Sequence, residues 1–158
     1  MSIKMSKRLL KEINLLDKYS DNGIRFIKTK MLVWKVIVSN FDENTNIFKE
    51  LKKYKLDHIE MELTISNKAY PFEAPFVRIV KPRFVKYTQG FITAGGSLCA
   101  DILTPTGWSP CITIPTLMFQ LKLLIKDAII DSNDFNKEYT LVEAKKHYNR
   151  TTKYHGWG

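Results

Sequence analysis

The stretch that decides the fold is residues 95–103, Gly-Gly-Ser-Leu-Cys-Ala-Asp-Ile-Leu, followed by Gly-Trp-Ser-Pro at residues 107–110. Two glycines precede the cysteine, and a short apolar segment follows it. Glycine permits turns that are closed to other residues, so a bulky partner can approach the Cys99 sulfur. One cysteine beside two glycines leaves two interpretations open, a nucleophile and a structural residue. Cys111 follows a proline among apolar residues, and we expect it to be buried.

Hydrophobic periodicity upstream of this stretch predicts one helix and four strands. Leu9, Leu10, Ile13 and Leu16 recur at helical spacing. Strands are expected at residues 24–27, 34–38, 58–65 and 76–80, close enough in sequence to form an antiparallel meander. The strict alternation in residues 58–65 predicts one face on the core and one in solvent. Residues 41–57 are expected to form a long polar loop with a helical turn near residues 47–51.

The second half of the chain is predicted to contain an irregular loop and two helices. Regular patterning is lost after residue 80 for about thirty residues, a length that is usually functional in a compact domain. Helices are expected at residues 114–130, with Pro115 in the first turn, and at residues 141–154. This order predicts an α+β fold in one domain, residues 1–158, with helices against one face or end of an antiparallel sheet.

Composition is typical of a soluble protein from a reducing compartment. Hydrophobic residues make up 44% and charged residues 26%, and two cysteines cannot build a disulfide scaffold. Residues 1–8 lack the apolar core of a secretion signal, and polar residues interrupt the apolar stretch 114–130, so no membrane partner is expected. We expect a cytoplasmic or nuclear location, in a host cell if the chain is viral.

The net charge of +9 leaves an acidic partner, nucleic acid or simple solubility as explanations. Nucleic acid is the less expected partner, because zinc-finger spacing, an arginine cluster and an aromatic RNA-binding signature are all missing. The common phosphate-loop and zinc-protease motifs are missing as well, so we expect no cofactor and no metal.

Three features together resemble the catalytic core of ubiquitin-conjugating enzymes. They are Tyr70-Pro71-Phe72 with Pro75, the corner Trp108-Ser109-Pro110, and Cys99 between them. The resemblance extends from Lys7 to Trp157. Most members of that family carry His-Pro-Asn shortly before the cysteine, whereas this chain has Phe91-Ile92-Thr93.

That departure is similar to the divergent Q-type branch of the family, which lacks His-Pro-Asn. The branch has Pro-Phe-Val-Arg before two β-branched residues, an aromatic residue and a glycine run before Leu-Cys, and a tail that ends in Gly-Trp. The matching residues here are 75–80, 91–99, Tyr139, Thr140, Leu141, Ala144, Tyr148, His155 and Trp157. A tyrosine of that branch is replaced by Phe91, so any role of its hydroxyl is lost.

The resemblance implies the ubiquitin-conjugating (UBC) fold: an N-terminal helix, a four-stranded antiparallel meander, an active-site loop and two C-terminal helices. It also implies an enzyme that accepts ubiquitin on Cys99 as a thioester and transfers it to lysine or hydroxyl acceptors. Thr93 is the candidate oxyanion donor. His155 is the candidate general base for hydroxyl acceptors, and Trp157 is a candidate support of the site.

The partners implied by the resemblance are ubiquitin, the ubiquitin-activating enzyme, an acceptor protein and, as an optional component, a ubiquitin ligase. The surface that meets the activating enzyme and ligase would contain Lys7, Arg8, Lys11, Phe72 and Pro110. Two alternatives stay open: a non-catalytic UBC-like domain that binds ubiquitin or scaffolds a partner, and a basic adaptor for nucleic acid.

Overall fold

The computed structural model describes residues 3–16, 18, 22–86, 91–154 and 156, and its centre is a four-stranded sheet in the order β1-β2-β3-β4. All three strand pairs are antiparallel, so the predicted meander is confirmed. The strands are β1 (Ile24–Lys30), β2 (Val33–Val38), β3 (Ile59–Thr64) and β4 (Phe76–Lys81).

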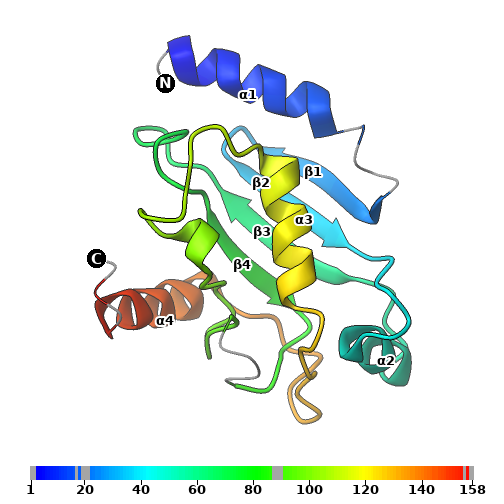
Figure 1. Ribbon diagram of the computed structural model, residues 1–158. Coiled ribbons are helices and arrows are strands. Elements are labelled where there is room, and N and C mark those ends of the chain that lie inside the picture. Colours follow the sequence, from blue (N-terminus) through cyan, green and yellow to red (C-terminus); the bar gives the residue numbers. More distant parts are fainter. Residues whose placement is uncertain (1–2, 17, 19–21, 87–90, 155, 157–158) are drawn as a thin grey trace.

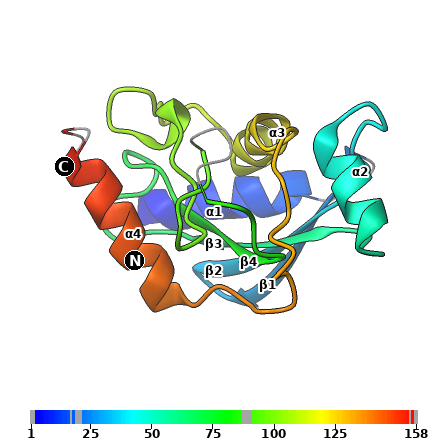
Figure 2. The same ribbon diagram turned by 90° about the horizontal axis from the view of Figure 1, so that it is seen from below.

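Helices cover one face and the ends of this sheet, as expected for the α+β class. Helix α3 lies across one face of the sheet, α1 runs along one end, and α2 and α4 lie at opposite sides (Figures 1 and 2). Their bounds are α1 (Ile3–Leu16), α2 (Asn46–Lys53), the short 3₁₀ helix η2 (Asp101–Leu103), α3 (Ile114–Leu124) and α4 (Leu141–Tyr154). Within the described part of the chain, no helix combines the length and apolar character needed to cross a bilayer.

The hydrophobic core lies between α3 and the sheet. Trp34, Met61 and Ile79 on the strands and Leu117 and Met118 on α3 are completely buried. Burial of each such side chain contributes about 1.5–3 kcal/mol, so this layer holds α3 in place on the sheet. The alternation of residues 58–65 is confirmed for the core face, where every apolar side chain of β3 is buried.

The outer face of β3 differs from the expectation. Glu60 was expected in solvent, but it is only 6% exposed. Because β3 is an interior strand, lysines on both neighbouring strands flank this carboxylate, and Lys35 and Lys81 form ion pairs with it. A buried carboxylate needs such partners, since an unpaired charge is costly to remove from water.

Two expected helix boundaries were wrong. The helical turn predicted near residues 47–51 is present but longer than expected: α2 has eight residues, is capped by Thr45 and is buried at Ile47 and Leu51. Helix α3 ends at Leu124, well before the predicted residue 130. The chain turns there, and Ile130 then pairs with Phe84 in an isolated bridge.

Cys111 was expected to be buried and is exposed. It lies in a surface turn, and burial begins only at Ile114, where α3 starts. Apolar neighbours in the sequence therefore did not predict the burial of this cysteine.

Lys122 anchors α3 to the sheet end through its charge. Its ammonium group donates to the carbonyl oxygens of Asn22, Ser39 and Asn40 at 2.8, 2.6 and 2.9 Å. A lysine has three donors, so all of them are used. Burial lowers the pKa of Lys122, and the three carbonyls compensate for the water that the ammonium has lost.

Candidate active site

Cys99 lies at the end of a tight hairpin formed by residues 91–99. The Cys99 N–H donates to the Phe91 carbonyl at 2.8 Å, and the Thr93 N–H donates to the Ser97 carbonyl at 3.0 Å. Between these pairs, Ile92 and Leu98 form an isolated bridge. Gly96 adopts a φ of +85°, a left-handed conformation that glycine accepts without steric cost. The glycine pair therefore makes the turn that presents the cysteine.

This hairpin docks on the free edge of β4. The Ile79 N–H donates to the Gly96 carbonyl at 2.8 Å, and the Leu98 N–H donates to the Val77 carbonyl at 2.9 Å. Arg78 and Ser97 are antiparallel bridge partners. This pairing is an isolated bridge, and Cys99 follows Ser97 by two residues on the same hairpin strand.

The two glycines also serve a purpose that we did not expect. A Cβ on Gly95 would lie 2.3 Å from the Glu143 carbonyl oxygen in α4, and a Cβ on Gly96 would lie 2.5 Å from the Tyr139 ring. We had expected them to open the sulfur to a bulky partner. That expectation stays a prediction, and within the fold the two glycines let α4 and the segment before it pack directly on the hairpin.

The Cys99 side chain is enclosed and its thiol is hard to ionise. The residue is 6% exposed. Burial raises the pKa of the Cys99 thiol, and the nearby charge of Asp101 raises it further. A protonated thiol is a weaker nucleophile than a thiolate, so these two effects lower the intrinsic reactivity of the Cys99 sulfur.

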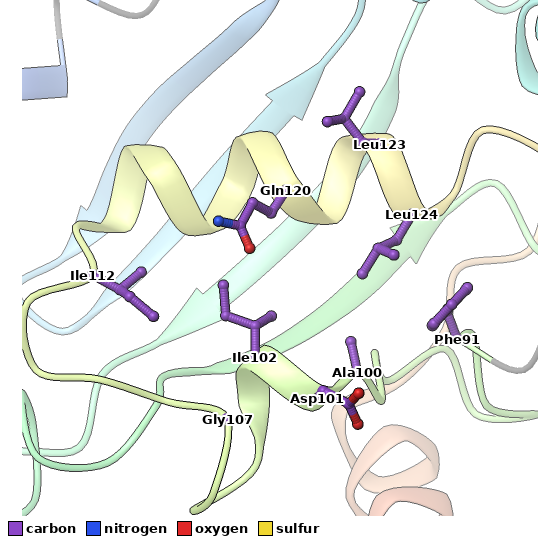
Figure 3. A pocket seen from close by; sticks show the side chains of 9 residues that line it. All are labelled: Phe91, Ala100, Asp101, Ile102, Gly107, Ile112, Gln120, Leu123 and Leu124. Atoms are coloured by element: carbon purple, nitrogen blue, oxygen red, sulfur yellow. The ribbon is translucent and has the colours of Figure 1, made fainter.

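A groove of about 610 Å³ begins beside the cysteine, between η2 and α3. Ala100 and Ile102 point from the η2 side toward α3, and Gln120 and Leu124 point back across the groove (Figure 3). The walls are mostly apolar, with Asp101 and Gln120 as polar groups. The lining residues are Phe91, Ala100, Asp101, Ile102, Gly107, Ile112, Gln120, Leu123 and Leu124.

Thr93 lies at the turn end of the hairpin. It is buried, and its hydroxyl is 2.6 Å from the Ser97 hydroxyl. The hairpin pairs Thr93 with Ser97 and Cys99 with Phe91, so Thr93 is two residue pairs away from the cysteine. His155 and Trp157, the other two candidates, lie outside the described residues.

The predicted partner-binding residues fall on three neighbouring segments. Lys7 and Lys11 are exposed on α1, Phe72 is 75% exposed after β3, and Pro110 is half-buried in the loop before α3. Arg8 is committed to contacts inside the protein. Its Nε donates to Glu12 at 2.7 Å, and its Nη2 donates to the Ile112 carbonyl at 2.7 Å.

Glu12 holds these segments together, and the sequence analysis missed it. The carboxylate is 1% exposed and accepts hydrogen bonds from Arg8, from the Tyr70 hydroxyl at 2.9 Å and from the Ile114 N–H at 2.9 Å. It thereby joins α1, the loop after β3 and the start of α3. The sequence could have indicated this role, because Glu12 lies between Leu9 and Leu16 on the apolar stripe of the first helix, where a carboxylate requires buried partners.

Comparison with known proteins agrees with this architecture. The family model described as ubiquitin-conjugating enzyme matches residues 8–155. Ubiquitin-conjugating enzyme E2 25 of Caenorhabditis elegans is 30% identical over 99% of this chain and 43% of its own length. Human ubiquitin-conjugating enzyme E2 Q1 is 25% identical over 99% of this chain and 39% of its own length. This chain thus spans less than half the length of these two relatives.

Solved structures show the same fold at lower identity. A ubiquitin-conjugating enzyme E2 from Agrocybe aegerita superposes with a TM-score of 0.60 at 19% identity, covering 81% of this chain and 88% of that one. An E2 domain from Toxoplasma gondii gives a TM-score of 0.58 at 21% identity, covering 92% and 88%. The UBC fold is therefore confirmed, and so is the likeness to Q-type relatives. With its family model matched along almost the whole sequence, the chain belongs to the ubiquitin-conjugating enzyme family.

Proposed function

We propose that the protein carries ubiquitin as a thioester on Cys99 and transfers it to an acceptor. The observation that carries this proposal is the placement of the cysteine: it closes a hairpin fixed to β4 and adjoins an apolar groove. The Cys99 sulfur attacks the carbonyl carbon of ubiquitin bound to the activating enzyme. A new C–S bond forms, the old C–S bond breaks, and the proton of Cys99 ends on the departing thiol.

The groove between η2 and α3 accommodates the C-terminal tail of ubiquitin in this proposal. Its apolar walls bind an extended peptide by removing apolar surface from water, and Asp101 and Gln120 provide polar contacts. Ala100, the residue after Cys99, lines the groove, so a tail lying there runs along the segment that carries the cysteine.

Phe72, Lys7 and Lys11 form the proposed docking surface for the activating enzyme and a ligase. A phenylalanine that is 75% exposed gains from burial in a partner, and the two exposed lysines favour an acidic partner. Pro110 borders this surface. Arg8 acts indirectly, because its contacts with Glu12 and the Ile112 carbonyl hold the surrounding segments.

Hydroxyl acceptors are the finer part of the proposal. An acceptor hydroxyl loses its proton during attack, and His155 is the proposed base, supported by Trp157. His155→Ala should preserve discharge of ubiquitin onto lysine and slow discharge onto serine. A His155→Ala variant that discharges ubiquitin onto serine at the wild-type rate would refute this role of His155.

A charging assay tests the proposed function. The protein, ubiquitin, ATP and an activating enzyme are incubated and analysed on reducing and non-reducing gels. We expect a thiol-sensitive adduct in wild type and in Cys111→Ala, and its loss in Cys99→Ala. Cys111 is the matched control, because it is a free cysteine on the surface.

Two results would overturn the proposal. An adduct that persists in Cys99→Ala would exclude Cys99 as the nucleophile. No adduct in wild type, with an activating enzyme that charges another conjugating enzyme, would favour the non-catalytic UBC-like domain.

A further inference from the structure

Helix α4 carries Tyr148 on the part of the molecule that meets the hairpin of Cys99. The Tyr148 ring packs edge-on against Phe76, with ring centroids 5.3 Å apart and an interplanar angle of 86°. Phe76 begins β4 two residues before Arg78, which pairs with Ser97 in the bridge that holds the hairpin on this strand. Helix α4 also packs directly on Gly95 of the hairpin, and Tyr148 lies close enough to Cys99 for the thiol to act on the pKa of the phenol.

The Tyr148 hydroxyl is available as a donor. Among the residues that the structure describes, it makes no hydrogen bond, although the side chain is half-buried. Burial raises the pKa of Tyr148, and the proximity of Cys99 raises it further. The phenol therefore keeps its proton at neutral pH and can only be a neutral donor or acceptor.

The chemistry at Cys99 needs such a donor. Attack on a thioester converts the carbonyl oxygen, two bonds away from the sulfur, into an oxyanion, and preorganised donors at this position commonly supply the largest share of catalysis. The Thr93 hydroxyl is paired with Ser97 at the other end of the hairpin.

We propose that the Tyr148 hydroxyl donates a hydrogen bond to the carbonyl oxygen of the thioester on Cys99 and stabilises the oxyanion during transfer. The inference rests on the proposed function. The lone pair of the acceptor amine forms the C–N bond, and the C=O π pair moves to oxygen. Collapse restores C=O and breaks the C–S bond, and the amine proton passes to solvent. Tyr148 keeps its own proton throughout.

Single-turnover discharge of the charged enzyme onto free lysine tests this role. Tyr148→Phe removes the hydroxyl and keeps the ring against Phe76. We expect the maximal discharge rate to fall by about 100–1,000-fold, with an unchanged half-saturating lysine concentration and an unchanged unfolding temperature. Tyr54→Phe is the matched control, because Tyr54 also packs on a phenylalanine ring but lies at the end of α2.

A second variant tests the placement of the phenol. Phe76→Leu removes the ring that supports Tyr148 and retains the hydroxyl, so discharge should slow by a smaller factor than in Tyr148→Phe. If either variant is less stable, the assay is run at a temperature where circular dichroism shows it to be folded.

The outcomes separate this inference from the function on which it rests. Failure of the wild type to charge refutes the proposed function. A wild type that charges and a Tyr148→Phe variant that discharges at the wild-type rate refute the inference alone. A change only in the half-saturating lysine concentration also refutes it, because an oxyanion donor acts on the transition state.

Discussion

Glu143→Gln should destabilise the protein by about 2 kcal/mol at neutral pH. Arg83 contacts both oxygens of the Glu143 carboxylate, at 2.8 and 3.0 Å, and the Thr140 N–H donates to it at 2.7 Å. Together with the bond from the Glu143 N–H to the Thr140 hydroxyl, this forms a capping box at the start of α4. The interaction therefore fixes the helix that packs on the hairpin of residues 91–99.

The magnitude follows from the ionisation of the carboxylate. Burial raises the pKa of Glu143, but the Arg83 and Thr140 bonds outweigh it and lower the pKa from 4.5 to about 2. A pKa gap of about 2.5 corresponds to about 3.4 kcal/mol. The Glu143 side chain is 27% exposed, so solvent screening reduces this to about 2 kcal/mol.

The direction of the pKa shift determines how the stabilisation by Glu143 changes with pH. Because the folded pKa lies below the unfolded value, the stabilisation is fully present above the unfolded pKa and is lost as pH falls through the folded pKa. Urea unfolding followed by circular dichroism at pH 7 and pH 3 measures it. The difference in free energy of unfolding between wild type and Glu143→Gln should be roughly half as large at pH 3 as at pH 7.

Glu138→Gln is the control for this experiment. Glu138 is 61% exposed and 3.9 Å from Lys81, so its loss should change the free energy of unfolding by less than about 0.5 kcal/mol. The reasoning would be refuted if Glu143→Gln were as stable as wild type at pH 7, or if its deficit were the same at both pH values.

Three further predictions concern the hairpin, the thiol and the docking surface. In Gly96→Ala, an alanine at a φ of +85° would also clash with the Tyr139 ring, so the free energy of unfolding should fall by about 1–3 kcal/mol. A variant that unfolds at the wild-type temperature would contradict this. Asp101→Asn removes a charge that raises the pKa of Cys99, so the pH profile of alkylation by iodoacetamide should move to lower pH; an unmoved profile would exclude the Asp101 effect. Phe72→Ala should leave the free energy of unfolding within about 0.5 kcal/mol and slow charging by the activating enzyme. Normal charging would remove Phe72 from the docking surface.

Hydrophobic periodicity was sufficient to predict a helix or strand wherever a single helical or strand period extended through the segment. Three strands were predicted to within one residue of their observed bounds, whereas β1 continues three residues beyond its predicted end at residue 27. Strict alternation of apolar and polar residues identified β3. Helix α2 was underestimated, because its eight residues contain few apolar side chains among asparagine and lysine. Such a short helix depends on its buried Ile47 and Leu51 and on the cap at Thr45, more than on intrinsic propensity.

Burial of single residues was the least predictable property. Glu60 alternates as a solvent residue should, but two lysines on neighbouring strands cover it. Cys111 lies among apolar residues in sequence and is on the surface. Burial depends on which elements pack around a position, and a sequence window contains only one of them.

The sequence by itself determined the order and type of most elements, the family resemblance and the choice of Cys99, because these depend on periodicity and on residues close together in the chain. Only the tertiary structure decided which separate elements meet at the hairpin of Cys99 and at Glu12. The docking of the hairpin on β4, the Glu12 junction and the approach of Tyr148 all join residues from separate elements. Strand register and the crossing of α4 bring them together, and both arise from packing of the whole chain, which no local pattern encodes.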